Sequence, residues 1–376
     1  MKNQSITEAM LQFIEESPTA FHAAANVEAL LLENGFEKLE NLAEGALVPG
    51  GSYYTMQNGS AVLAVKIPEN PAKGFRIAAS HSDSPCFKIK EVPEMKVENT
   101  YVKLNVEKYG GMILSPWLDR PLSVAGRVFV AGKDGKPEAK LVNLKKDLLI
   151  IPNVAIHFNR EINNGFAYNP QTDMAPLMGL DQELSIKKLC AEAVDVAEEE
   201  ILGSDLYVYN RDKGRIMGAD DSLIGSPRLD DLQCAYATLR GFLASKPEES
   251  ISVYALFDNE EVGSGTKQGA DSTFLEEFLE IVLENVYPDK NRLWKRSFYQ
   301  NSFLLSADNG HAVHPNHPEK TDPTNRPYLN GGVVLKYNGS QKYTTDGYSA
   351  AIVHQICNTW ELSLIHISEP TRLRRI

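Results

Sequence analysis

The sequence predicts an α/β protein with a mixed, mostly parallel sheet, helices on both faces, and an inserted, mostly β domain. Two observations lead to this prediction. Helix and strand patterns alternate near both ends of the chain, whereas the middle contains short strand patterns separated by turns. The 376 residues, 43% of them hydrophobic, suffice for one to three domains.

The individual elements follow from the spacing of apolar residues. Residues 6–36 show helical spacing, which Ser17-Pro18 interrupts with a turn. The further elements expected, in order, are strands at 52–56, 61–67 and 75–80, a strand at 206–210 that closes the β region, a helix at 230–245, a strand at 251–257, a helix at 272–287, strands at 302–308 and 333–338, and a helix over 343–362.

Composition narrows the class of protein. A net charge of -12, with no basic block before the last few residues, indicates that the chain binds no nucleic acid. No segment approaches the roughly 20 apolar residues of a membrane span, and the N-terminus lacks the pattern of a signal peptide. The four cysteines form no CxxC pair, which is typical of reduced cytoplasmic thiols. We therefore expect a cytoplasmic protein without membrane contact, in which any metal is held by histidine and carboxylates.

Polar side chains follow three of the predicted strands directly. Functional residues of open α/β sheets collect beyond the carboxyl ends of strands, so these side chains can converge. With the carboxylates at the start of the predicted helix in 226-SPRLDDL-232, the candidates are His81, Asp83, Asp230, Asp231, Glu260, Glu261 and Asp308. Adjacent carboxylates at the end of a buried strand are costly without a positive partner. This set predicts a metal site.

The types of ligand indicate which metals fit. One histidine with several carboxylates suits Zn²⁺, Mn²⁺ or Co²⁺, and a carboxylate can bridge two ions about 3.5–4 Å apart. One of Glu260 and Glu261 can then be a ligand while the other is a general base. Each motif alone has an alternative interpretation. His81-Ser82-Asp83 can be a capped turn, the glutamate pair a solvated surface, and RLDDL a helix start with favourable acidic residues.

Longer motifs carry a family resemblance. They are 17-SPTAFHA-23, 79-ASHSDSPCFKIK-90, 113-ILSPWLDRPLSVAGRV-128, 151-IPNVAIHFNRE-161, 226-SPRLDDL-232, 258-DNEEVGSGTKQGADS-272 and 306-SADNGHAVHPNHPEK-320. Together they resemble the aspartyl aminopeptidase family of cocatalytic metallopeptidases, in family order and over nearly the whole chain through about Glu361. The resemblance implies two divalent ions, most simply Zn²⁺.

Carried over residue by residue, the resemblance implies a role for each candidate. His81 and Asp308 would be the terminal ligands of opposite metals, Asp230 would bridge the two metals, and Glu261 would be a further ligand. Glu260 would be the general base, and Asp83 would orient His81. It also implies two substrate contacts. His157 would reach into a neighbouring subunit's active site, and Lys336 would meet an acidic side chain of the substrate. Without a role in substrate binding, His157 would be a polar residue on a half-buried strand, and Lys336 would be a lysine on an edge strand.

The resemblance further implies domains and an assembly. The catalytic domain would comprise residues 1–91 and 218–361, and residues 92–217 would form the dimerisation domain of a homo-oligomer, a tetrahedral dodecamer in that family. The expected function is a metal-dependent aminopeptidase that releases acidic N-terminal residues, Asp or Glu, from peptides. The alternatives are a related two-metal amide hydrolase, such as a deacylase or carboxypeptidase, and a catalytically inactive oligomeric scaffold.

The end of the chain differs in character from the rest. The segment 362-LSLIHISEPTR-372 resembles the translation of a sequencing adapter, which makes residues 362–376 a suspected non-native tail. The alternative is an unusual but genuine C-terminus. The resemblance implies that a truncated chain would lack a late histidine ligand. On this hypothesis, the chain binds its second metal weakly and is weakly active or inactive.

Overall fold

The structure, a computed structural model, describes residues 2–40 and 47–368. The chain divides into two compact units, Met1–Asp308 and Asn309–Ile376. Within the described residues, the first unit contains two six-stranded sheets, and the second a two-stranded sheet with one α-helix.

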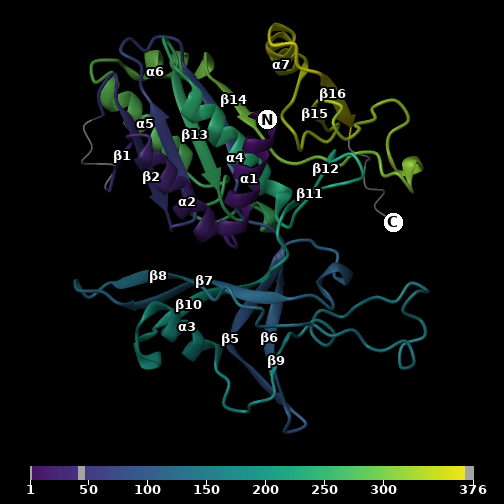
Figure 1. Ribbon diagram of the computed structural model, residues 1–376. Coiled ribbons are helices and arrows are strands. Elements are labelled where there is room, and N and C mark those ends of the chain that lie inside the picture. The colour runs from purple at the N-terminus through teal and green to yellow at the C-terminus, as the bar shows by residue number, and fades with distance from the viewer. Residues whose placement is uncertain (1, 41–46, 369–376) are drawn as a thin grey trace. The chain divides into compact units, whose positions relative to one another are not determined.

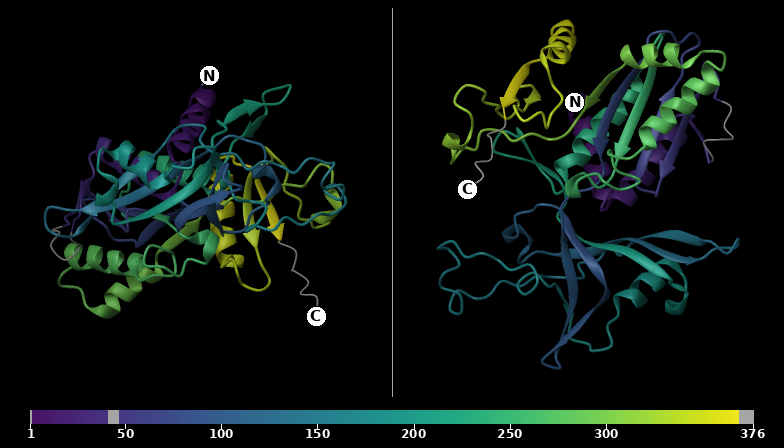
Figure 2. Two further views of the ribbon diagram at one scale, coloured as in Figure 1. Left: turned by 90° about the horizontal axis from the view of Figure 1, so that it is seen from below. Right: turned by 180° about the vertical axis from the view of Figure 1, so that it is seen from behind.

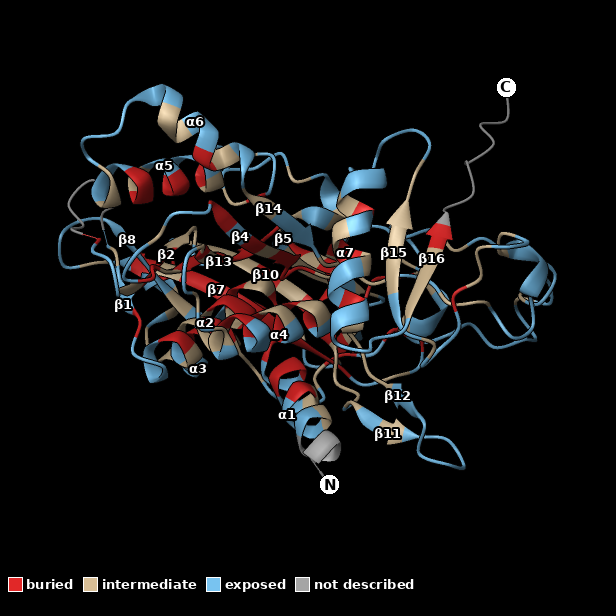
Figure 3. Cartoon of the chain, turned by 90° about the horizontal axis from the view of Figure 1, so that it is seen from above, coloured by how far each residue is buried: buried red, intermediate tan, exposed pale blue. Residues whose placement is uncertain are grey.

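The first sheet contains the strands that the alternating pattern predicts. Its order is β1 (Glu37–Lys38), β2 (Ser52–Gln57), β3 (Ala61–Lys66), β13 (Ile251–Phe257), β4 (Phe75–His81) and β14 (Phe303–Ser306). β13, β4 and β14 run parallel, as do β1 and β2, whereas β3 is antiparallel to both β2 and β13. The mixed, mostly parallel sheet is thus confirmed. Its central strands β4 and β13 are largely buried (Figure 3), as expected for near-continuous apolar runs.

Helices cover both faces of this sheet, as predicted (Figures 1 and 2). Successive strand residues point to opposite faces, so Ala64 and Tyr254 pack with α1 (Lys2–Glu16), α2 (Ala20–Glu33) and α4 (Leu229–Ala244). Their neighbours Leu63 and Val253 pack with α5 (Phe274–Val286) and α6 (Arg292–Gln300) on the other face. The two apolar cores hold the sheet between two helical layers.

The second sheet is antiparallel throughout. Its order is β8 (Pro137–Asn143), β7 (Leu122–Ala131), β10 (Gly203–Asn210), β5 (Cys86–Val97), β6 (Tyr101–Tyr109) and β9 (Leu177–Gly179), and α3 (Ile186–Val194) packs into its core. Two strands here are longer than the short strands expected, since β5 has 12 residues and β7 has 10. β5 remains one strand across an irregularity in register between Ile89 and Glu94.

Smaller elements complete the first unit. They are the hairpin β11 (Arg215–Met217) and β12 (Leu223–Gly225), and the 3-10 turns η1 (Ser115–Trp117), η2 (Glu198–Glu200) and η3 (Glu260–Val262). η3 follows β13 directly and carries both glutamates of the predicted site.

The second unit pairs β15 (Val333–Tyr337) in parallel with β16 (Leu364–Ser368), and contains η4 (Pro318–Lys320) and α7 (Gly347–Thr359). α7 starts later than the predicted 343, because Asp346 caps it by accepting the amide hydrogen of Ser349 at 2.8 Å. Over the described residues of both units, no helix is long and apolar enough to cross a membrane.

Candidate metal centre

Three parallel strands bring the predicted site residues to one edge of the first sheet. Phe257 at the end of β13 is in register with His81 at the end of β4, and Ser306 of β14 is in register with Ala79. Asp308 follows Ser306 by two residues, so it emerges at the same edge. The sequence patterns could indicate that these strand ends meet, because each strand, including the 4-residue β14, is an apolar run with polar residues at or just after its end.

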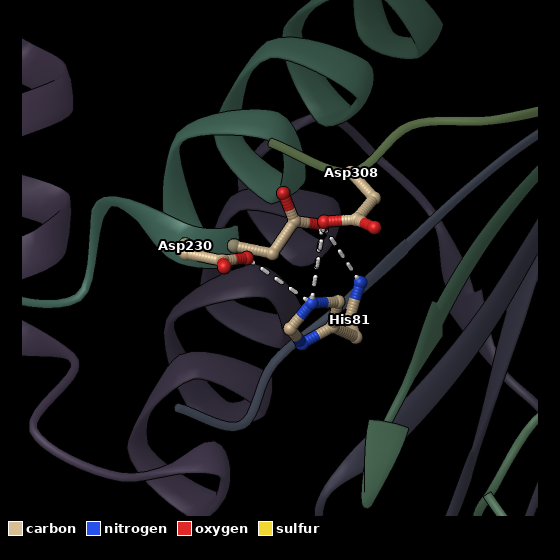
Figure 4. Close-up of side chains that lie close together, drawn as sticks. His81, Asp230 and Asp308 are labelled. Atoms are coloured by element: carbon tan, nitrogen blue, oxygen red, sulfur yellow. Dashed lines mark hydrogen bonds and ion pairs between the residues drawn. The ribbon is translucent and has the colours of Figure 1, made fainter. Parts of the chain in front are cut away.

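His81 lies at the centre of a cluster of carboxylates (Figure 4). Its Nε2 is 3.4 Å from Asp230 Oδ1 and 4.0 Å from Asp308 Oδ1. Asp231 Oδ2 lies 4.0 Å from the same nitrogen and also accepts the His81 backbone N–H at 3.2 Å. The cluster therefore contains three of the four predicted ligands and adds Asp231.

The donor set fits a zinc ion. One ligand atom from each of the four residues lies within 4.8 Å of all the others, and imidazole nitrogen with carboxylate oxygen is ligation that Zn²⁺ accepts. Asp231 is fully buried, and its Oδ1 has no hydrogen-bond partner among the described residues. Burial raises the pKa of Asp231 to about 7. A cation beside this carboxylate would offset the cost of burying its charge.

The electrostatics of His81 reflect the same excess of negative charge. Burial alone would lower the pKa of His81, but hydrogen bonds to Asp230 and Asp83 and the charges of Asp231 and Asp83 outweigh burial and raise the pKa to about 11. A positively charged group is strongly favoured at this position, whether it is a proton or a metal ion.

The two adjacent glutamates take different positions on η3. Glu260 Oε2 lies 3.9 Å from His81 Nε2, at the edge of the cluster. The carboxylate of Glu261, the fourth predicted ligand, is not in the four-residue cluster. Burial, with the charges of neighbouring carboxylates, raises the pKa of both side chains, that of Glu261 to about 7, although the charge on His81 opposes the shift.

Asp83 connects the histidine to the glutamate turn. This buried carboxylate lies 3.2 Å from His81 Nδ1 and accepts the backbone N–H groups of Glu260 and Glu261, both at 3.2 Å. It also accepts the Tyr109 hydroxyl at 2.7 Å. The sequence did not indicate Tyr109, because nothing near the end of the β6 segment signals that this tyrosine contacts Asp83.

A cavity of about 350 Å³ borders the cluster, with Asp83 and Asp230 in its wall. Five of the quoted motifs contribute to its lining, among them those that contain Phe21, Trp117 and Arg228. Segments that are far apart in the sequence thus enclose one space beside the predicted metal centre.

The two predicted substrate contacts lie away from this cluster in the sequence. His157 lies in an exposed turn, so the alternative of a histidine on a half-buried strand is wrong. Lys336 lies on β15 in the second unit, where its amine donates to the backbone oxygen of Asn309 at 2.7 Å and lies 5.5 Å from the centre of the Tyr343 ring.

An α/β sheet with a histidine-carboxylate cluster beside its strand ends suits a metal-dependent hydrolase, and comparison with known proteins identifies the family. The profile described as Aminopeptidase I zinc metalloprotease (M18) matches residues 13–368. A relative from Clostridium acetobutylicum, named Probable M18 family aminopeptidase 2, is 44% identical over 366 residues, which cover 95% of this chain and 84% of the relative.

Solved structures agree with this match. A chain in the structure of the Ape4 and Nbr1 complex has a TM-score of 0.92 and 31% identity, and the match covers 98% of this chain and 75% of that one. Chaetomium thermophilum mApe1 has a TM-score of 0.87 and 30% identity, and the match covers 97% of this chain and 86% of that one. The chain belongs to the M18 family of zinc aminopeptidases, which confirms the predicted resemblance and class of enzyme.

The comparisons also bear on the end of the chain. The family match continues past the suspected boundary at residue 362 and includes β16, which pairs with β15 over five residue pairs. The hypothesis of a non-native tail therefore has no support within the described residues, which end at 368.

Proposed function

We propose that this aminopeptidase removes acidic residues, Asp or Glu, from the N-termini of peptides. The observation that carries the catalytic part is the cluster of His81, Asp230, Asp231 and Asp308 with Glu260 at its edge. The proposed ligands of two divalent ions are His81, Asp230, Glu261 and Asp308, with Zn²⁺ as the first candidate and Mn²⁺ or Co²⁺ as alternatives.

The chemistry of the proposed site follows from its ligands and its free carboxylate. Bound zinc ions polarise a carbonyl group and lower the pKa of water. Glu260 takes the proton of the attacking water on its carboxylate and passes it to the leaving amine. Its side chain is 52% exposed, so it can reach a substrate. The raised pKa of Glu260 brings its proton affinity closer to that of an efficient base at neutral pH.

The specificity part of the proposal rests on Lys336 and His157. A lysine attracts an acidic side chain and repels a basic one, which favours substrates that begin with Asp or Glu. His157 is proposed to reach the site of a neighbouring copy. In support, the same exposed segment presents Val154, Ile156 and Phe158, the last 87% exposed, as an apolar surface suited to protein contact.

The same surface supports the proposed organisation. Residues 92–217, which contain most of the second sheet, would form the dimerisation domain of a homo-oligomer, and residues 1–91 with 218–361 the catalytic domain. An assembly assay with Phe158→Ser tests this directly. A variant with an unchanged oligomeric state would contradict the proposed role of this segment.

Substrate assays test the activity. The enzyme should hydrolyse aspartyl and glutamyl anilides faster than leucyl or lysyl anilides, with Zn²⁺, Mn²⁺ or Co²⁺ added in turn. Faster hydrolysis of N-acyl amino acids would favour a deacylase, and release of C-terminal residues a carboxypeptidase. Elemental analysis of His81→Ala should show less bound metal, because one ligand is lost. Unchanged metal stoichiometry would remove His81 from the ligands.

Replacing Lys336 tests the specificity pocket. Lys336→Leu should lower the ratio of aspartyl to leucyl hydrolysis by about tenfold, because one charge-assisted contact is worth roughly 1.5 kcal/mol. Lys342→Leu, which removes an exposed lysine of the same unit, is the matched control. An unchanged ratio in Lys336→Leu would contradict the pocket assignment while leaving the metal centre untouched.

A further inference from the structure

The end of β6 contacts the glutamate turn of the metal centre, although β6 belongs to the second sheet. We propose that Tyr109 is a positioning residue of the metal centre, which holds Asp83 in the orientation that His81 and the Glu260-Glu261 turn require. This inference rests on the proposed metal site. It assigns to the second sheet a part in catalysis that is separate from assembly.

The hydroxyl of Tyr109 joins two groups of the site. It donates to Asp83 Oδ2 at 2.7 Å and accepts a hydrogen bond from Asn259 Nδ2 at 2.8 Å. The bond to Asp83 is the shortest that this carboxylate accepts, since its bonds with His81 Nδ1 and the two glutamate N–H groups are all 3.2 Å. An O–H···O⁻ bond of this length is among the stronger types of hydrogen bond in proteins.

Asn259 is itself held in one orientation. Its Oδ1 accepts hydrogen bonds from Thr266 Oγ1 at 2.7 Å and Gln268 Nε2 at 2.8 Å, so its Nδ2 must point toward Tyr109. Its backbone is left-handed with φ of 62°, a conformation that asparagine tolerates better than most residues. Tyr109 thus connects Asp83 to an amide that is fixed immediately before Glu260.

The residue after Tyr109 provides an independent contact with the same turn. A methyl group at Gly110 would lie 3.0 Å from Glu261 Cβ and 3.4 Å from Glu261 Oε2. A side chain at this position would displace Glu261 by a few tenths of an ångström, and φ of 73° also favours glycine. Tyr109 and Gly110 together therefore fix both Asp83 and the space that Glu261 occupies.

The inference predicts a loss that truncating a merely structural tyrosine would not cause. Residues that orient a metal-bound histidine typically contribute 10–100-fold to metal affinity or activity when mutated. Tyr109→Phe keeps the ring, which packs edge-on against Tyr207 with centroids 5.8 Å apart, and removes only the hydroxyl. We expect its zinc affinity and its kcat at saturating zinc each to fall about tenfold, with KM changed less than about twofold.

The experiment compares Tyr109→Phe with Tyr207→Phe in the full chain. Zinc affinity is measured by competition with a chelator, and kcat and KM on an aspartyl anilide. Tyr207→Phe also removes the hydroxyl of a partly buried tyrosine, but not one that bonds to Asp83, and should retain the wild-type zinc affinity and kcat. Asn259→Gly tolerates the left-handed backbone, removes the fixed amide, and should reproduce the loss of kcat in a milder form.

The outcomes separate this inference from the function on which it rests. Wild-type zinc affinity and kcat in Tyr109→Phe would overturn the inference, and so would an equal loss in Tyr207→Phe, because the loss would then not depend on the hydrogen bond to Asp83. Failure of the metal centre itself would appear differently, as unchanged metal content in His81→Ala.

Discussion

Replacing Glu260 by glutamine separates a proton-transferring role from a metal-binding role. Glutamine keeps the size of the side chain but cannot take up a proton from water at neutral pH. The backbone N–H of Glu260, which donates to Asp83 at 3.2 Å, is unaffected by the change. Glu260→Gln therefore removes the proposed base and leaves the turn that carries it in place.

The expected magnitudes follow from the site. A positioned general acid-base contributes about 10²–10⁴-fold to the rate, so the barrier should rise by roughly 3–5 kcal/mol. The side chain is 52% exposed and lies outside the four-residue cluster. The free energy of unfolding should then change by less than about 0.5 kcal/mol, and the metal content should stay near that of the wild type.

The assay measures kcat on an aspartyl anilide, metal stoichiometry by elemental analysis, and unfolding by urea. Glu277→Gln, on the exposed face of α5, makes the same chemical change away from the site and should leave all three quantities unchanged. Turnover of Glu260→Gln within threefold of the wild type would refute the role as base. A large loss of metal would instead indicate that Glu260 is a ligand.

Two further predictions concern stability. Arg127→Met should lower the free energy of unfolding by about 3 kcal/mol, because Arg127 donates to Asp205 at 2.9 Å and to the Asn58 backbone oxygen at 2.6 Å. This value is the low end of the range for breaking a buried ion pair, since Asp205 is partly exposed. A change below about 1 kcal/mol in urea unfolding would contradict this. Burial first, then neighbouring cations, lowers the pKa of His22 from 6.5 to about 4. Between pH 6.5 and 4, His22 is therefore protonated in the unfolded chain but neutral in the folded chain. The free energy of unfolding of the wild type should fall more steeply over this range than that of His22→Asn. Equal slopes would show that His22 is not linked to folding.

The sequence could predict the strand-end part of the site because its signals are local. His81 and Asp308 each end or follow an apolar run, and parallel strands bring such ends together. The 9-residue helix α6 was not predicted, since only Phe298 of its side chains is buried and its apolar pattern is short. Local signals thus sufficed for strands with continuous apolar runs, the short β14 and β15 among them, and failed for this mostly exposed helix.

Within the site, the choice between adjacent carboxylates also needed the fold. Asp230 and Asp231 are equivalent in the sequence, as two acidic residues at the start of a helix. In the structure the Asp231 side chain is fully buried, whereas that of Asp230 is 56% exposed. The exposed carboxylate of Asp230 is open to solvent, whereas the buried carboxylate of Asp231 is held beside the histidine, 4.0 Å from His81 Nε2, and accepts the His81 backbone N–H. This difference depends on how α4 packs against β4, which no spacing in the sequence encodes.

The contact between Tyr109 and Asp83 shows how both sheets of the first unit contribute to the candidate metal centre. β4 ends at His81 and β5 begins at Cys86, so the chain leaves one sheet and enters the other within residues 82–85. β6 then returns the chain to the site and places Tyr109 against Asp83. The apolar core of the second sheet is separate from the two cores around the first. Packing in the second sheet can therefore influence His81 through the connection at 82–85 and through the hydrogen bonds of Asp83. Any effect of the second sheet on the proposed catalysis thus depends on these few polar groups.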